Sequence, residues 1–212
     1  MPFLHCTSRT AGEPHPDLLT ELGFTGFPAL AFLDAEGKVL ARVDFEQRSV
    51  AAFRTIAEGV QSYRAMRTAL ADDGGEPDLH MRAELLLAEA RLRRWSFQEL
   101  DARMQVFGKT LPAEHAAQLA PLRSELEFDW LTRLRDITPR EKADRLKVFW
   151  RERRVPTGRR ELFFWLEYGA AGKAVEDPTM LDLAAEVLES RADAPNGVTA
   201  AYRKQAEELR RR

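Results

Sequence analysis

The sequence predicts an α+β fold that is mostly α-helical. Two apolar runs, 29–33 and 39–45, flank a turn segment from Asp34 to Gly37, and apolar runs joined by such a turn indicate a β-hairpin. From residue 49 onward, apolar residues recur at helical spacing, and no strand pattern appears beyond residue 78. We therefore expect a short hairpin-and-helix segment, followed by an α-helical bundle or repeat-like domain.

The first predicted domain spans residues 1–70. The run Pro2–Cys6 is a strand candidate, and a short helix over 18–22 precedes the hairpin. A helix over 49–70 closes the segment. The residues expected on its buried face are Val50, Phe53, Ile56, Ala57 and Val60.

A linker separates this segment from the helical domain. Residues 71–78 are rich in Gly, Asp and Pro, which are typical of a loop. Residues 79–212 then contain about seven helical patterns joined by short connections, so neighbouring helices should pack as antiparallel hairpins. Ser96 and Glu99 have the spacing of a capping box and mark the start of one of these helices.

Prolines mark two further helices of this domain. Thr138 and Glu141 form a second capping box, with Pro139 at the first helical position. Pro121 lies inside a long helical pattern over 112–137. Because proline removes a backbone hydrogen bond, this pattern is either one long helix or a helix kinked at Pro121.

The helical domain loosely resembles tetratricopeptide-type repeats. Residues 83–104, AELLLAEARLRRWSFQELDARM, have small and large apolar residues where such a repeat has them. No second copy aligns at the period of 34 residues that this repeat family shows. A repeat array and a generic helical bundle therefore stay open.

The segment LLTELGFTGFPALAFLDAEGKVLARVDF, residues 18–45, resembles the C-terminal half of a thioredoxin-fold domain. In that family a cis proline opens the third strand of the minimal fold. Pro28 matches this proline, and Gly23 and Gly26 match the turn before it. The resemblance covers about residues 1–70.

This resemblance implies a peptide-binding role for two residues. In the family, the residue before the cis proline offers its backbone to an extended peptide. Carried over, Phe27 would be the backbone contact, Pro28 would be the platform, and the bond between them would be cis. Pairing of a guest chain with a sheet edge is a known mode of peptide recognition.

The chain also departs from the family. The redox motif Cys-x-x-Cys would lie upstream of the strand Pro2–Cys6, so no catalytic residue is expected in this sequence. Cys6 is the only cysteine, and one thiol cannot complete a dithiol cycle. We expect Cys6 to be a small buried side chain, with a reactive thiol as the less favoured alternative.

Two functions follow from these patterns. The first is a non-catalytic protein-binding or scaffold module that binds a protein or peptide partner. The alternative is a thiol–disulfide oxidoreductase whose redox segment lies upstream of Met1. In either case one edge of the strand over 29–33 lacks its family partner, so we expect Pro2–Cys6 to pair there, with a homodimer through that edge as the runner-up.

Composition excludes other classes of function. The formal net charge is -2 and no apolar stretch of about 18 residues occurs, so neither a nucleic-acid partner nor a membrane partner is expected. A single cysteine and the lack of a signal-peptide pattern favour a cytoplasmic protein. No cofactor motif is found.

Three remaining patterns have both a chemical and a structural interpretation. His80 and Glu84 are one helical turn apart, but two ligands make no site, and no metal site is expected. The basic C-terminus, Arg210–Arg212, is expected to be frayed and solvated rather than a phosphate site. The aromatic run 162–169 is expected to form the helical core.

Overall fold

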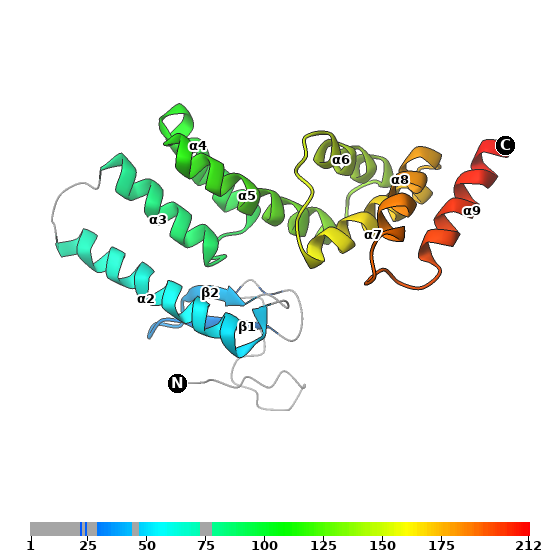
Figure 1. Ribbon diagram of the computed structural model, residues 1–212. Helices are drawn as coiled ribbons and strands as arrows, with labels where there is room; N and C mark the ends of the chain where they lie inside the picture. The colour runs from blue at the N-terminus through cyan, green and yellow to red at the C-terminus, as the bar shows by residue number, and fades with distance from the viewer. Residues whose placement is uncertain (1–21, 23, 25–28, 44–46, 73–77) are drawn as a thin grey trace, which may run out of the picture. The chain divides into compact units, whose positions relative to one another are not determined.

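The computed structural model describes residues 22, 24, 29–43, 47–72 and 78–212. It divides into two compact units, Met1–Arg94 and Trp95–Arg212. In the described part of the chain there is a two-stranded antiparallel sheet and eight α-helices (Figure 1). The predicted fold class, α+β and mostly α, is confirmed.

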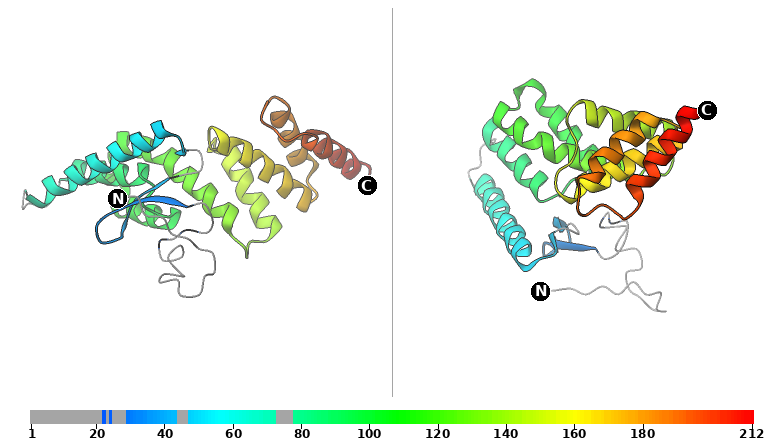
Figure 2. Two further views of the ribbon diagram at one scale, coloured as in Figure 1. Left: turned by 90° about the horizontal axis from the view of Figure 1, so that it is seen from below. Right: turned by 45° about the vertical axis from the view of Figure 1, so that its right-hand side comes forward.

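The elements follow the chain in a simple order. The first unit contains β1 (Leu30–Leu33), β2 (Val39–Val43), α2 (Val50–Asp72) and α3 (Leu79–Arg91). The second unit contains α4 (Phe97–Phe107), the 3₁₀ turn η2 (Gly108–Thr110), α5 (Ala113–Arg133), α6 (Pro139–Arg151), α7 (Arg159–Ala174), α8 (Pro178–Glu189) and α9 (Val198–Arg211). Within the second unit, Figure 2 shows the helices from α6 to α9, coloured yellow-green to red, following one another along the chain.

Asp34 and Gly37 build the turn of the β-hairpin. Asp34 Oδ1 accepts the N–H groups of Glu36 at 3.0 Å and Lys38 at 2.7 Å. Gly37 has φ of 79°, a left-handed conformation that glycine adopts without steric cost. The register pairs Leu30 with Val43, Ala31 with Arg42 and Phe32 with Ala41. The predicted hairpin is therefore confirmed.

Side-chain caps fix where several helices begin. Both predicted capping boxes are present, at Ser96 with Glu99 and at Thr138 with Glu141. Asp78 caps α3 by accepting the N–H of Met81 at 2.8 Å. These caps satisfy backbone donors that a helix start leaves unpaired.

Three helices end in the same backbone turn. The residue after the last helical turn of α3, α6 and α7 has positive φ, at Arg93 (51°), Arg153 (55°) and Glu176 (55°). In each turn the next amide donates to a carbonyl five positions back, as Arg94 does to Glu89. This pattern is the Schellman turn, here built without glycine.

Each unit has its own apolar core. In the first unit, β2, α2 and the end of α3 enclose Leu40, Ala41, Val43, Ile56, Val60, Tyr63 and Leu92. In the second unit the core is larger and rich in aromatic rings, including Phe128, Phe149, Phe164, Trp165 and Tyr168.

The helical patterns predicted from the sequence are present, with local differences. On α2, Val50 is 80% exposed, contrary to the expected buried face, whereas Tyr63 is buried at 4%. Helix α5 runs continuously through Pro121. Residues 73–77 of the predicted linker lie outside the described residues.

A glycine on α7 allows the last helix of the second unit, α9, to pack closely against it. A Cβ atom placed on Gly169 of α7 would lie 2.2 Å from the ring of Tyr202, a residue of α9. The Tyr202 hydroxyl donates to the Leu166 carbonyl at 3.0 Å. Glycine at position 169 therefore makes room for the tyrosine ring.

Candidate functional site: the two edges of the β-hairpin

The hairpin orients the main-chain groups of Ala31 away from β2. The N–H of Arg42 donates to the carbonyl of Leu92 at 3.1 Å, outside the sheet. Arg42 faces Ala31 in the register. In an antiparallel pair, opposed residues either exchange both hydrogen bonds or direct both sets of groups outward. The N–H and C=O of Ala31 therefore point to the outer edge of β1.

The outer edge of β2 is covered by the turn that ends α3. Arg42 Nη1 donates to the carbonyls of Arg93 at 3.0 Å and Arg94 at 2.8 Å. In return, Arg94 Nε donates to the Val39 carbonyl of β2 at 3.3 Å. We call this reciprocal pair, Arg42 and Arg94, the arginine clasp. Its cations lie at the carbonyl end of α3, where the helix dipole favours positive charge.

The same guanidinium of Arg42 also reaches the chain that leads into the hairpin. Its Nη2 donates to the Leu22 carbonyl at 3.2 Å. Its Cζ lies 5.7 Å from the centroid of the Phe24 ring. One side chain thus joins β2, the end of α3 and the segment before β1.

A buried polar network supports Arg94. Its Nη1 lies 3.0 Å from Glu89 Oε1 and also contacts the Tyr63 hydroxyl, which donates to Glu89 at 3.0 Å. The guanidinium lies over the Tyr63 ring at 4.6 Å. The side chains of Arg94 and Glu89 are only 16% and 10% exposed. Because each buried charge has a partner, the network holds Arg94 in place at the β2 edge.

The outer edge of β1 differs from that of β2. Among the described residues, no strand pairs with it. Leu30 and Leu33 are 37% and 38% exposed on this strand. Phe32 packs toward α2, with its ring centroid 6.1 Å from that of Phe53. The hairpin therefore has one covered edge and one apolar edge that offers the main-chain groups of Ala31.

The residues predicted for the peptide site lie outside the described residues. This applies to Phe27 and Pro28, to the bond between them, and to Cys6. It applies equally to the strand Pro2–Cys6, so its pairing with β1 stays a prediction. Ala31 lies three residues after Pro28 on the same stretch of chain.

Two other sequence patterns are placed by the structure. The ligand atoms of His80 and Glu84 lie within 4.8 Å of one another on α3, a pair that by itself supplies two of the four ligands of a structural zinc site. The basic C-terminus is helical up to Arg211, contrary to the expected fraying. Arg210 pairs with Asp182 and Arg212 with Glu176.

Most of the aromatic run of α7 is buried in the helical core, as predicted. Phe164, Trp165 and Tyr168 are buried, whereas Phe163 is 46% exposed. Trp150 of α6 is 41% exposed and packs edge-on against Trp165. Burial raises the pKa of the Tyr168 hydroxyl, consistent with its place in an apolar core.

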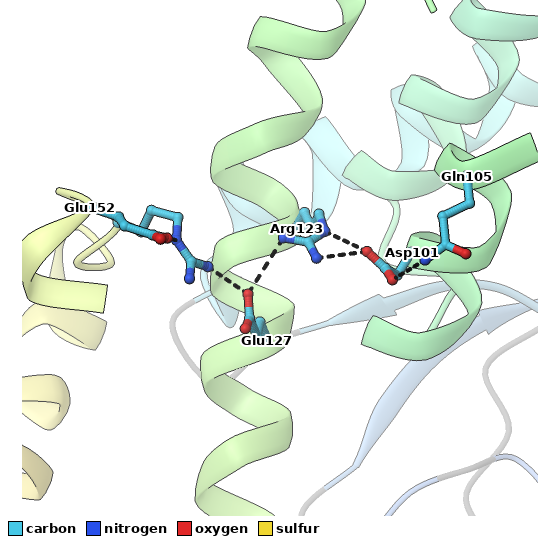
Figure 3. A network of polar contacts seen from close by, with 6 residues as sticks. Asp101, Gln105, Arg123, Glu127 and Glu152 are labelled. Carbon is cyan, nitrogen blue, oxygen red and sulfur yellow. Dashed lines mark hydrogen bonds and ion pairs between the residues drawn. The ribbon is translucent and has the colours of Figure 1, made fainter. Parts of the chain in front are cut away.

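A second polar network crosses the helical unit. Arg123 on α5 binds Asp101 on α4 at 2.7 Å and lies 3.5 Å from Glu127 (Figure 3). Glu127 in turn accepts from Arg154 at 2.6 Å. Gln105 and Glu152 complete the two ends of the chain of contacts. The side chains of Arg123, Asp101 and Glu127 are 30%, 26% and 19% exposed. The network joins α4, α5 and the end of α6.

Comparisons with protein-family models, with curated proteins and with solved structures give no significant match for this chain. Within the described residues, no helix combines the length and the apolar character needed to cross a membrane.

Sequence reasoning missed the residues that close the β2 edge. Arg42 is a charged residue within an otherwise apolar strand, and Glu89 is an acid on the buried face of a helix. Each exception to an amphipathic pattern signals a buried polar contact. The sequence contains this signal, but it does not show that the partners are carbonyl groups of Leu22, Arg93 and Arg94.

Proposed function

We propose that this chain is a non-catalytic protein-binding or scaffold module, and that an extended segment of a partner protein pairs with the outer edge of β1. The observation that carries the proposal is the difference between the two edges. The turn after α3 covers β2, while Ala31 directs its N–H and C=O away from the sheet.

An edge strand with unpaired main-chain groups is a template for another strand. A partner segment would exchange two hydrogen bonds with Ala31, and its side chains would contact the half-exposed Leu30 and Leu33. Main-chain bonds supply affinity in this mode of recognition, and the flanking side chains supply specificity. The resemblance to the thioredoxin fold supports the same region, because Phe27 and Pro28 lie within three residues of the start of this strand in the sequence.

Ala31→Pro tests the proposal. Proline at position 31 removes the outward N–H but no hydrogen bond to β2, and proline is tolerated on edge strands in this orientation. The matched control is Ala31→Ser, which keeps the N–H. The probe is a fluorescently labelled, lysine-capped peptide of alternating valine and threonine, with binding followed by anisotropy.

We expect wild type and Ala31→Ser to bind the peptide, and Ala31→Pro to bind it about tenfold more weakly or less. Circular dichroism and hydrogen exchange of β2 verify that the hairpin persists in the variant. Equal binding by Ala31→Pro would exclude β1 as the binding edge. If the wild-type chain sediments as a dimer and Ala31→Pro sediments as a monomer, the β1 edge is instead occupied by a second copy of this chain.

A further inference from the structure

We propose that Arg42 determines which edge of the hairpin accepts a partner strand. This inference rests on the proposed function, because it concerns the same sheet. Arg42 would act as a specificity determinant by keeping the β2 edge covered. Strand addition is then directed to β1.

The geometry of the arginine clasp carries the inference. Arg42 binds the turn after α3 through its main chain, at Leu92, and through its side chain, at Arg93 and Arg94. The bonds to Arg93 and Arg94 share a single nitrogen, Nη1. Two further described hydrogen bonds join the turn to β2, one from the Arg42 N–H and one from Arg94 Nε. The side chain of Arg42 therefore supplies half of these described bonds.

The arrangement needs arginine rather than a positive charge alone. The guanidinium donates in two directions at once, from Nη1 to the turn and from Nη2 to the Leu22 carbonyl. A lysine ammonium has three donors on one atom and lacks the planar fork from which arginine donates through two separate nitrogens. Lysine at position 42 should therefore fail to restore the covered edge.

The N–H of Arg42 and the C=O of Val39 would become accessible if the turn moved away from β2. These two groups face outward on β2, as the N–H and C=O of Ala31 do on β1. A sheet with two open edges can pair on either side. The loss of Arg42 should thus allow binding that no longer depends on position 31.

The experiment combines Arg42→Met with Ala31→Pro. Methionine keeps a long apolar stem but removes all guanidinium donors. The valine–threonine peptide is the probe, and Arg64→Met, at an exposed arginine of α2, is the matched control for the same chemical change. Arg42→Lys tests whether charge alone suffices.

In the wild-type and Arg64→Met backgrounds, we expect Ala31→Pro to weaken peptide binding. In the Arg42→Met and Arg42→Lys backgrounds, the same change should weaken binding less than about threefold. The amide of residue 42 should also exchange faster in both of these variants. An unchanged amide and an undiminished effect of Ala31→Pro would overturn the inference.

A second measurement keeps the inference separate from the proposed function. Sedimentation velocity of Arg42→Met with Ala31→Pro needs no peptide. Concentration-dependent association of this double variant, absent from Ala31→Pro alone, would support the role of Arg42 even if wild type binds no peptide. A monomeric double variant whose residue 42 amide stays protected would refute it.

Discussion

Helices α3 and α6 are built alike but are held in different ways, one in each unit. Each has an N-cap, 13 helical residues and a closing turn with arginine in the left-handed conformation, followed by a second arginine. The second arginines, Arg94 and Arg154, each place the guanidinium carbon 4.6 Å from the centroid of an aromatic ring.

The two arginines differ in which element supplies the aromatic ring and which supplies the less exposed carboxylate. Arg94 lies over Tyr63 from α2 and pairs with Glu89 from its own helix. Arg154 lies over Phe149 from its own helix and pairs with Glu127 from α5, besides an exposed pair with Glu152 at the end of its own helix. Local sequence thus fixes the helix ends and the turn, while tertiary packing determines which partners the arginine receives.

The two networks differ in burial, so the loss of each arginine should affect stability to a different extent. Glu89 is 10% exposed, and Arg94 also binds the β2 strand. Glu127 is 19% exposed and has a second cation, Arg123, at 3.5 Å. Within the described residues, the first unit combines this polar network with a small core. The second unit has a broad aromatic core, and its Glu127 contacts two arginines.

The largest expected effect comes from Arg94→Met. It removes the guanidinium that contacts the Glu89 carboxylate, which is only 10% exposed, and breaking a buried ion pair costs about 3–5 kcal/mol of unfolding free energy. Because all four tryptophans lie in the second unit, hydrogen exchange of α2 and α3 is the suitable measurement, and tryptophan fluorescence should change little. Adding Glu89→Gln removes the buried negative charge at position 89, so the double variant should recover part of the loss. A loss below about 1 kcal/mol would contradict a network that holds the first unit.

Arg154→Met is the matched change in the second unit and should cost only about 1 kcal/mol. Its carboxylate partner stays partly solvated and keeps Arg123. Urea unfolding followed by tryptophan fluorescence measures the loss, and raised salt should reduce the difference from wild type. If Arg154→Met costs as much as Arg94→Met, burial is not what distinguishes the two arginines.

The smallest expected effect is a gain. Arg93→Gly and Arg153→Gly place glycine where φ is 51° and 55°, which relieves steric strain at the end of each helix. We expect each to raise the unfolding free energy by about 0.5 kcal/mol, after the entropic cost of glycine is counted. Thermal unfolding by circular dichroism checks this, with Arg151→Gly, at the last helical residue of α6, as a control that should destabilise because glycine is a poor helix former. Destabilisation by both turn variants would mean that their arginine side chains contribute more than the strain costs.

Local features of the fold could be predicted from the sequence because they depend on neighbouring residues. The turn at Asp34 and Gly37 and the capping boxes at Ser96 and Thr138 each involve groups within about four positions. The buried face of α2 is harder to predict. The expected stripe included Val50 and omitted Tyr63, because which part of a long helix meets a sheet depends on tertiary packing.

The candidate site could be predicted only in part. The apolar strand follows from the sequence pattern, and the resemblance implies that one of its edges lacks the family's partner strand, for which Pro2–Cys6 stays the expected substitute. The arginine clasp does not, because it joins Arg42 to carbonyls near residues 22 and 93. Main-chain carbonyls have no residue-specific signature, so no spacing in the sequence marks them as acceptors.

Amide hydrogen exchange of Ala31 and Arg42 by NMR, in the free chain without peptide, tests the difference between the two edges most directly. The N–H of Arg42 is bonded to the Leu92 carbonyl, and that of Ala31 points outward. We predict that the Arg42 amide exchanges much more slowly than the Ala31 amide, and that addition of the valine–threonine peptide slows Ala31 alone. Equal protection of both amides in the free chain would contradict an open β1 edge and would show that a strand already occupies it.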